Sequence, residues 1–164
     1  MFQNRATTKR DVAAVDLLLA LAYPRLLKAD YPPSTLVMAV PLISRAQPVL
    51  VACGTYYVVE EDGAVLGAGG WTVAPPGKGS ITRGVGHIRH VVTDDRATRR
   101  GVARTLMTRI CADAENIGLR RLHCLSTLTA APFYAAMGFD TLGPVSITLA
   151  AGIDFPAIEM ERHL

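Results

Sequence analysis

The sequence has few of the residues that build disulfide frameworks or zinc sites. It holds three cysteines, Cys53, Cys111 and Cys124, an odd number without a Cys-x-x-Cys pair. Neither a disulfide scaffold nor a zinc knuckle is therefore indicated. This cysteine usage favours a reducing compartment, so we expect a cytoplasmic protein that binds no metal.

Long apolar runs and long basic runs are also missing. The longest apolar segment near the start covers residues 12–23, but it contains Asp16 and is too short to span a bilayer. The N-terminus, M-F-Q-N-R-A-T-T-K-R, is polar and unlike a secretory signal. The net charge is +3, and no Lys/Arg run has the length expected of a nucleic-acid-binding tail. We therefore expect neither a membrane nor a nucleic acid as a partner.

What the chain does contain is typical of a globular protein. Half of its 164 residues are hydrophobic and 19% are charged, which excludes a disordered chain. This length is enough to bury a sizeable core, and no internal repeat, low-complexity segment or linker divides it. We expect a single domain over residues 1–164.

Local patterns predict a mixture of helices and strands. Thr8 and Asp11 resemble a capping box that starts a first helix, and Asp62-Gly63 between two β-rich runs indicates a hairpin. The helices are expected over residues 10–27, 34–44, 101–118 and 132–137, and the strands over residues 55–60, 65–72, 87–93, 120–127, 145–149 and 155–162.

A loop rich in Gly and Pro is expected over residues 74–86. Its Gly77-Lys78-Gly79 sequence is similar to the end of a P-loop. The glycine required five residues earlier is absent, and no Ser or Thr follows Lys78. The sequence therefore excludes a P-loop here.

The most informative stretch predicts a strand, a turn and a helix. Residues 87–93 are rich in β-branched side chains and contain no Gly or Pro, which favours a strand. After Gly101, apolar residues recur at helical spacing. We expect Thr98 to be the N-cap of this helix and Gly118 to end it in a left-handed conformation.

The turn before this helix has the features of an anion site. A helix N-terminus presents unpaired N–H groups and about half a positive elementary charge. Gly101 has no side chain, so an anion can approach the backbone closely. Arg99 and Arg100 add positive charge, and Ala103 keeps the first helical turn narrow. These residues predict a phosphate site, with a solvated arginine-rich turn before an ordinary helix as the alternative.

Two motifs in this region resemble those of the GNAT superfamily of N-acyltransferases. Residues 98–103, T-R-R-G-V-A, resemble motif A, Gln/Arg-x-x-Gly-x-Gly/Ala, with Thr98 in place of Gln or Arg. Residues 131–139, A-P-F-Y-A-A-M-G-F, resemble motif B, and the order and separation of the two motifs also match. The resemblance implies an α/β fold with a mixed, largely antiparallel twisted sheet flanked by helices on both faces.

The same resemblance implies acetyl-CoA as co-substrate and transfer of its acetyl group to a primary amine by direct attack in a ternary complex. Two alternatives stay open. One is a CoA-binding or regulatory module without turnover, and the other is a protein whose turn binds a different phosphate, such as a nucleotide. The acceptor is open between a small amine, an antibiotic, a peptide N-terminus and a protein lysine. The apolar C-terminal strands would allow pairing in a homodimer.

The resemblance places the coenzyme between the strands at residues 87–93 and 121–127. The extended backbone before motif A would bind the pantetheine arm like an added strand, with the Val91 N–H facing the acetyl carbonyl. The residues assigned to the coenzyme are Val91, Val92, Thr93, Thr98, Arg99, Arg100, Gly101, Val102, Ala103, Arg104, Thr127 and Phe133.

Tyr134 is the candidate for a general acid, because the family has a tyrosine at this motif B position near the coenzyme sulfur. A thiol ionises near pH 8.5 and a tyrosine near pH 10, so proton donation from Tyr134 is uphill at equilibrium. We therefore expect its hydroxyl to stabilise the departing thiolate by a hydrogen bond. The alternative is a core tyrosine with a satisfied hydroxyl.

Two histidines are candidates for the general base. Regular strand alternation places His87, Arg89 and Val91 on one face and His90 on the other. His87 is therefore our first choice and His90 the second, with deprotonation through water as the alternative. Arg89 is expected either to bind a substrate carboxylate or to pair with a neighbouring acid.

Overall fold

The computed structural model describes residues 1–164 and contains one seven-stranded sheet in the order β1-β2-β3-β4-β5-β7-β6. All neighbouring strands are antiparallel except β4 and β5, which are parallel. The strands are β1 (Gln3–Ala6), β2 (Tyr56–Glu61), β3 (Ala64–Thr72), β4 (Val85–Thr93), β5 (Arg121–Thr127), β6 (Asp140–Thr148) and β7 (Asp154–His163). The α-helices are α1 (Val12–Leu27), α2 (Pro33–Ile43), α3 (Pro48–Val51), α4 (Val102–Asn116) and α5 (Ala131–Ala136), and the 3-10 turns are η1 (Lys9–Asp11), η2 (Asp95–Ala97) and η3 (Ala150–Gly152).

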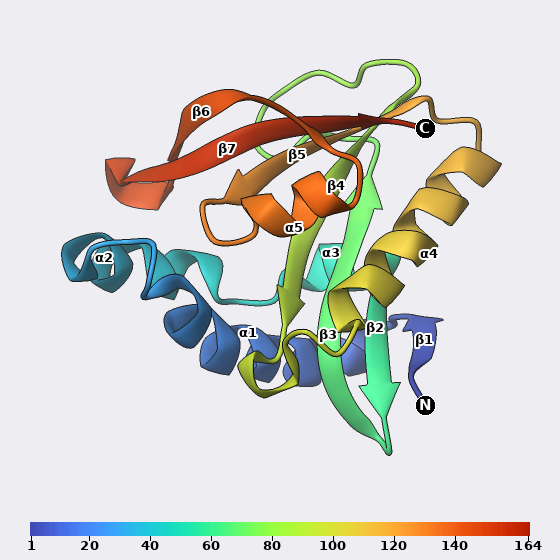
Figure 1. Ribbon diagram of the computed structural model, residues 1–164, viewed down its shortest axis with the longest axis horizontal. Helices are drawn as coiled ribbons and strands as arrows, with labels where there is room; N and C mark the ends of the chain where they lie inside the picture. The colour runs from blue at the N-terminus through green and yellow to red at the C-terminus, as the bar shows by residue number, and fades with distance from the viewer.

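Helices cover both faces of the sheet, as Figure 1 shows. Helix α1 packs on one face, where Leu19 joins Tyr56 and Val58 in a buried cluster. Helix α4 packs on the opposite face, where Leu106 and Met107 are fully buried. The predicted fold class, a mixed and largely antiparallel sheet between helices, is therefore confirmed.

Most of the expected elements are present with small shifts at their ends. The capping box is confirmed by a 2.8 Å hydrogen bond from the Thr8 N–H to Asp11 Oδ2. The left-handed conformation of Gly118 after α4 is also confirmed, with φ of 89°. Strand β1 and helix α3 were not expected, and β4 starts at Val85 within the expected loop.

The expected N-cap of α4 was wrong. Gly101 is the N-cap residue, in a left-handed conformation with φ of 89° and no side-chain cap. Thr98 instead donates its hydroxyl to the Asp95 carbonyl at 3.2 Å, within the preceding turn η2. The helix N-terminus is therefore left without a side chain bound to its N–H groups.

Strands β4 and β5 separate soon after they start. Their parallel pairing covers only Val85–His87 on β4 and Arg121–His123 on β5. Beyond these residues the two strands diverge, and α5 lies at the open end (Figure 1). Strand β7 continues to pair with β5 over its whole length. The sheet consequently has a wedge-shaped gap at its centre.

Strand β4 also carries an extra residue at His90. The register between β3 and β4 shifts between Ala68 and Gly70, and His90 has a positive φ of 53°. A Cβ added to Gly69 would lie only 2.6 Å from Val91 Cγ2, so β3 needs a glycine opposite this irregularity. The extra residue is a β-bulge, which redirects the side chains that follow it.

None of the helices has both the length and the hydropathy of a membrane span. The three cysteines are free thiols, as expected from their number and spacing.

Candidate functional site

A continuous groove follows the gap between β4 and β5. One end is a hollow of about 460 Å³ at the start of α4, lined by Thr93, Gly101 and Ala103. A narrow middle part is lined by Val91, Thr93, Ala103 and Phe133 from both sides of the gap. The other end, which we call the acceptor hollow, has a volume of about 300 Å³ and lies between the bulge of β4, the end of β5 and the segments around α2 and β7. Shared lining residues connect the three parts.

The first turn of α4 presents free backbone donors to the groove. The first intrahelical hydrogen bond runs from the Thr105 N–H to the Gly101 carbonyl, which leaves the N–H groups of residues 102–104 without a helical partner. A Cβ on Gly101 would meet nothing within 4 Å, so the approach to this turn is open. Residues 99–104 therefore fit a phosphate, because backbone donors and the helix dipole both favour an anion here.

The two arginines of the turn point in different directions. Arg99, with φ of 63°, lines the hollow together with Arg104. Arg100 instead makes a double hydrogen bond to Glu61, at 2.8 and 2.9 Å, and lies over the Phe2 ring. The expectation that the Arg100 side chain adds charge to the phosphate site was therefore wrong, because this side chain is paired with Glu61 and does not line the hollow.

The backbone of β4 offers a free edge to the middle of the groove. The Asp94 N–H donates to the Leu66 carbonyl of β3 at 2.7 Å. Because peptide groups alternate along a strand, Val92 also directs its N–H toward β3, while Val91 and Thr93 direct theirs toward the gap. No strand pairs with β4 on that side at these positions. Of the three residues assigned to the pantetheine arm, Val91 and Thr93 thus have free backbone groups and Val92 does not.

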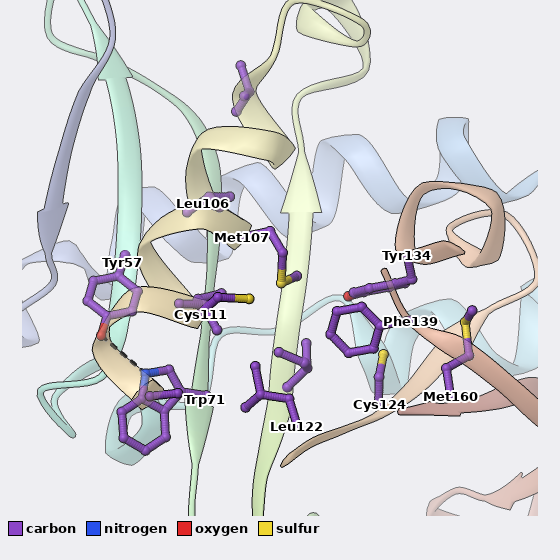
Figure 2. Close-up of a cluster of buried hydrophobic side chains, with 14 of the residues drawn as sticks. Tyr57, Trp71, Leu106, Met107, Cys111, Leu122, Cys124, Tyr134, Phe139 and Met160 are labelled. Carbon is purple, nitrogen blue, oxygen red and sulfur yellow. Dashed lines mark hydrogen bonds between the residues drawn. The ribbon is translucent and has the colours of Figure 1, made fainter. Parts of the chain in front are cut away.

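Tyr134 projects from α5 with its hydroxyl directed toward β4, beside Phe139 and Cys124 (Figure 2). Its side chain is almost completely buried, and it lines both the middle of the groove and the acceptor hollow. Burial raises the pKa of Tyr134 well above its ordinary value, and the neighbouring Cys124 thiol adds to this. The hydroxyl therefore stays protonated and is available as a hydrogen-bond donor.

Cys124 lies next to Tyr134 but is no nucleophile. The side chain is buried, and this burial raises the pKa of the thiol to about 12. The thiolate is the reactive form of cysteine, so a neutral thiol at this position is inert. Cys124 therefore contributes to packing.

The bulge overturns the expected alternation of β4. Ile88 and Val91 both pack on the α4 face, and Val92 packs on the α1 face. His87 and Val91 consequently lie on opposite faces, and the expectation that they share one was wrong. His87 does not line the groove; its ring lies edge-on to His123, at 5.4 Å between centroids, and both ring nitrogens are buried without a hydrogen-bond partner.

His90, the second choice, lines the acceptor hollow together with Tyr134. Its Nε2 lies 2.8 Å from the carbonyl oxygen of Ile43, so Nε2 must carry the proton and donate it. In the neutral ring, Nδ1 then keeps its lone pair and makes no hydrogen bond within the chain. Burial lowers the pKa of His90 below 6.5, which keeps the ring neutral near pH 7.

Two further tyrosines, which the sequence did not single out, surround the bulge. Tyr56 donates its hydroxyl to the His90 carbonyl at 2.9 Å and so holds the bulge in place. Tyr23 lines the groove, and its ring centroid lies 6.0 Å from that of His90. The only local signal for this arrangement is the glycine-rich sequence of β3, because glycines inside a strand often mark a bulge.

The remaining residues assigned to the coenzyme line the groove or lie beneath it. Thr127 and Phe133 line the groove from the β5 side, and the Thr127 hydroxyl accepts a hydrogen bond from the Ala130 N–H at 3.1 Å. Val102 is buried under the first turn of α4, where a Cβ on Gly67 would lie 2.5 Å from Val102 Cγ1. Val102 therefore contributes its backbone and the packing of the helix on β3.

Comparison with known proteins assigns the class. The family model described as the Acetyltransferase (GNAT) family matches residues 23–139, which is more than half of the chain. The chain therefore belongs to the GNAT acetyltransferase family, as its two motifs suggested. No curated protein matched the chain.

Several solved structures share the fold over almost the whole chain. A GCN5-related N-acetyltransferase from Rhodopseudomonas palustris has a TM-score of 0.76 at 16% identity, covering 99% of this chain and 95% of that chain. The PaiA N-acetyltransferase from Thermoplasma acidophilum, solved with coenzyme A, has a TM-score of 0.73 at 10% identity, covering 100% and 99%. YncA from Salmonella typhimurium, solved with acetyl-CoA, has a TM-score of 0.70 at 16% identity, covering 100% and 94%.

Proposed function

We propose that the protein transfers an acetyl group from acetyl-CoA to a primary amine by direct attack in a ternary complex. One observation carries the proposal: the free edge of β4 lies beside Tyr134 in a groove that begins at the N-terminus of α4. This arrangement offers a site for a diphosphate, a site for an extended arm and a buried hydroxyl in sequence along one path. The coenzyme complexes of the PaiA and YncA structures support the same choice of co-substrate.

The backbone performs the binding steps of the proposed reaction. The N–H groups of residues 102–104 bind the diphosphate, and Arg99 adds charge beside them. The edge of β4 binds the pantetheine arm, and the Val91 N–H donates to the acetyl oxygen, where negative charge develops during attack. The bound thioester supplies the acetyl carbon that the amine attacks.

Two side chains of the acceptor hollow, those of His90 and Tyr134, accept the proton of the amine and stabilise the leaving group. His90 Nδ1 accepts a proton from the attacking amine, because its Nε2–H is held by the Ile43 carbonyl. As the carbon–sulfur bond breaks and the carbon–nitrogen bond forms, the Tyr134 hydroxyl donates a hydrogen bond to the departing thiolate. His90 takes precedence over His87 as the base because only His90 lines the hollow that Tyr134 also lines.

Replacing Tyr134 by Phe tests the proposal. We expect kcat to fall about 100-fold, because the thiolate loses its donor, while coenzyme A still stabilises the variant in a thermal shift experiment. Tyr31→Phe is the matched control. The Tyr31 hydroxyl donates to the Pro156 carbonyl and accepts from the Leu128 N–H, and Tyr31 lines no part of the groove. This control should lower the melting temperature and leave kcat unchanged.

Three results would contradict the proposal. Full activity of Tyr134→Phe would show that the Tyr134 hydroxyl takes no part in the reaction. If coenzyme A stabilises the wild-type protein but no amine in a broad library is acetylated, the protein is a coenzyme-binding module. Stabilisation by ATP or NAD in place of coenzyme A would assign the turn at α4 to another phosphate. A saturating ligand, at 100 times its Kd, should add about 2.7 kcal/mol to the free energy of unfolding.

A further inference from the structure

One charged side chain stands out in the acceptor hollow. Most residues that line it are apolar, among them Leu42, Ile88, Ile147 and Phe155. Arg89 is its only permanently charged residue, because His90 is held neutral. The hollow therefore combines an apolar wall with a single fixed positive charge.

Arg89 has no acidic partner. Its Nη1 donates to the Thr72 hydroxyl at 3.1 Å and its Nη2 to the Gln47 side-chain carbonyl at 3.4 Å, and both acceptors are neutral. Other arginines of the chain, including the more exposed Arg5 and Arg100, do form ion pairs with carboxylates. A guanidinium has five N–H donors, so Arg89 keeps several that no protein group accepts.

A half-buried charge without an ion-pair partner destabilises the folded state, and such charges are usually paired in proteins. Burial already acts against Arg89, because desolvation lowers its pKa from the ordinary value. Arginine nevertheless remains charged in proteins, since its pKa is too high to be brought near neutrality. An anion in the hollow would offset this cost, and a planar carboxylate matches the guanidinium in geometry.

The position of Arg89 relative to the bulge restricts where this anion would sit. Arg89 directly precedes His90, and the two side chains contact Gln47, just before α3, and Ile43, at the end of α2. The bulge thus brings the guanidinium and the imidazole to the same wall of the hollow. An amine near His90 and a carboxylate on Arg89 would be separated by only a few bonds.

We propose that the acceptor is a small amine that also carries a carboxylate close to its amino group and an apolar side chain, such as a free apolar α-amino acid, and that Arg89 binds this carboxylate. The inference rests on the proposed acetyl transfer and adds the acceptor class. A peptide N-terminus is disfavoured, because an uncharged amide replaces the carboxylate next to its amino group.

The test compares each amino acid with the amine that lacks only its carboxylate. Suitable pairs are L-leucine with 3-methylbutylamine and L-phenylalanine with phenethylamine, with L-leucinamide standing for a peptide N-terminus. We expect wild-type kcat/KM to favour the amino acid at least about 10-fold over the amine and the amide, from the usual contribution of hydrogen bonds to a charged group. Arg89→Met should raise KM for the amino acid much more than KM for the amine, so that the preference disappears.

Arg45→Met is the matched control, because Arg45 is exposed just after α2 and lines no part of the groove. This variant should keep the wild-type preference. The proposal is overturned if the wild-type protein acetylates the amine or the amide as well as the amino acid. An equal loss for both acceptors in Arg89→Met would also overturn it, since a general defect in folding or catalysis has that effect.

Calorimetric titration of L-leucine and 3-methylbutylamine into the protein saturated with coenzyme A separates this proposal from acetyl transfer itself. Binding of leucine that is lost in Arg89→Met supports the carboxylate site even if no acetylation is detected. Absence of leucine binding in the wild-type protein overturns the site while the proposed transfer to other amines stays intact.

Discussion

The two ends of the groove are built by different means. At the α4 end, the donors are backbone N–H groups of a helix start, and Gly101 and Ala103 mainly keep space open for them. At the acceptor end, the chemistry depends on side chains from α1, β4, β5 and α5 that meet around a bulge. The first end is local in sequence and the second is assembled from distant segments. Under the proposed function, coenzyme binding and acceptor choice reside in separate parts of one groove.

The largest expected effect tests the α4 end. Ala103→Glu places a carboxylate in the first turn of α4, where residue 103 lines both the hollow at the start of α4 and the middle of the groove. We expect the Kd for coenzyme A to rise at least about 100-fold, because the charge repels the diphosphate and blocks the backbone donors. Calorimetric titration measures this. Ala112→Glu, on an exposed position of the same helix, should bind normally, and equal effects of the two variants would place the phosphate elsewhere.

A smaller effect is expected at the acceptor end. His90→Gln should lower kcat/KM about 10- to 100-fold at pH 7 with little change in coenzyme affinity, because it removes the base and leaves the α4 end intact. Burial lowers the pKa of His90 below 6.5, so the wild-type imidazole becomes protonated, and inactive as a base, only as the pH falls below this value. The acid limb of the wild-type pH profile should therefore lie below pH 6.5 and be absent from His90→Gln.

The matched control for this profile is His87→Ala. Because His87 lies outside the groove, this variant should keep both the rate and the acid limb. Measuring all proteins with one acceptor cancels the titration of the acceptor amine. A loss of the acid limb in His87→Ala alone would restore His87 as the base.

The smallest effect distinguishes the two arginines within the α4 end. Arg99→Gln should weaken coenzyme A binding about 3- to 10-fold at low salt, and less at high salt, because an exposed charge beside the hollow is screened. Arg100→Gln should change the Kd less than about 2-fold, because its guanidinium is already paired with Glu61. A larger effect of Arg100→Gln would mean that this ion pair opens when the coenzyme binds.

The sequence predicted the strand, turn and helix at the α4 end because their signals are local, although it placed the N-cap at Thr98 and not at Gly101. The turn residues 98–103 and the helical spacing after Gly101 lie within a short segment, and their conformation follows from backbone rules. Even there, the direction of the Arg100 side chain depends on Glu61, a residue of β2 that no local pattern connects to the turn.

The acceptor end could not be predicted to the same depth. The positions of most strands followed from hydrophobic patterns, but the bulge at His90 overturned the prediction that His87 and Val91 share one face. The absence of an acidic partner for Arg89 and the placement of Tyr23 depend on how α1 and the α2–α3 segment pack over the sheet. Such tertiary contacts override a regular strand period.

The short pairing between β4 and β5 has a consequence for how rigid the molecule is. Only three residues on each strand join the first four strands of the sheet to the last three. The amide protons of Val91 and Thr93, which face the gap, should therefore exchange quickly with solvent, and a ligand that occupies the gap should slow this exchange. The rigidity of the sheet would then increase with the concentration of the co-substrate.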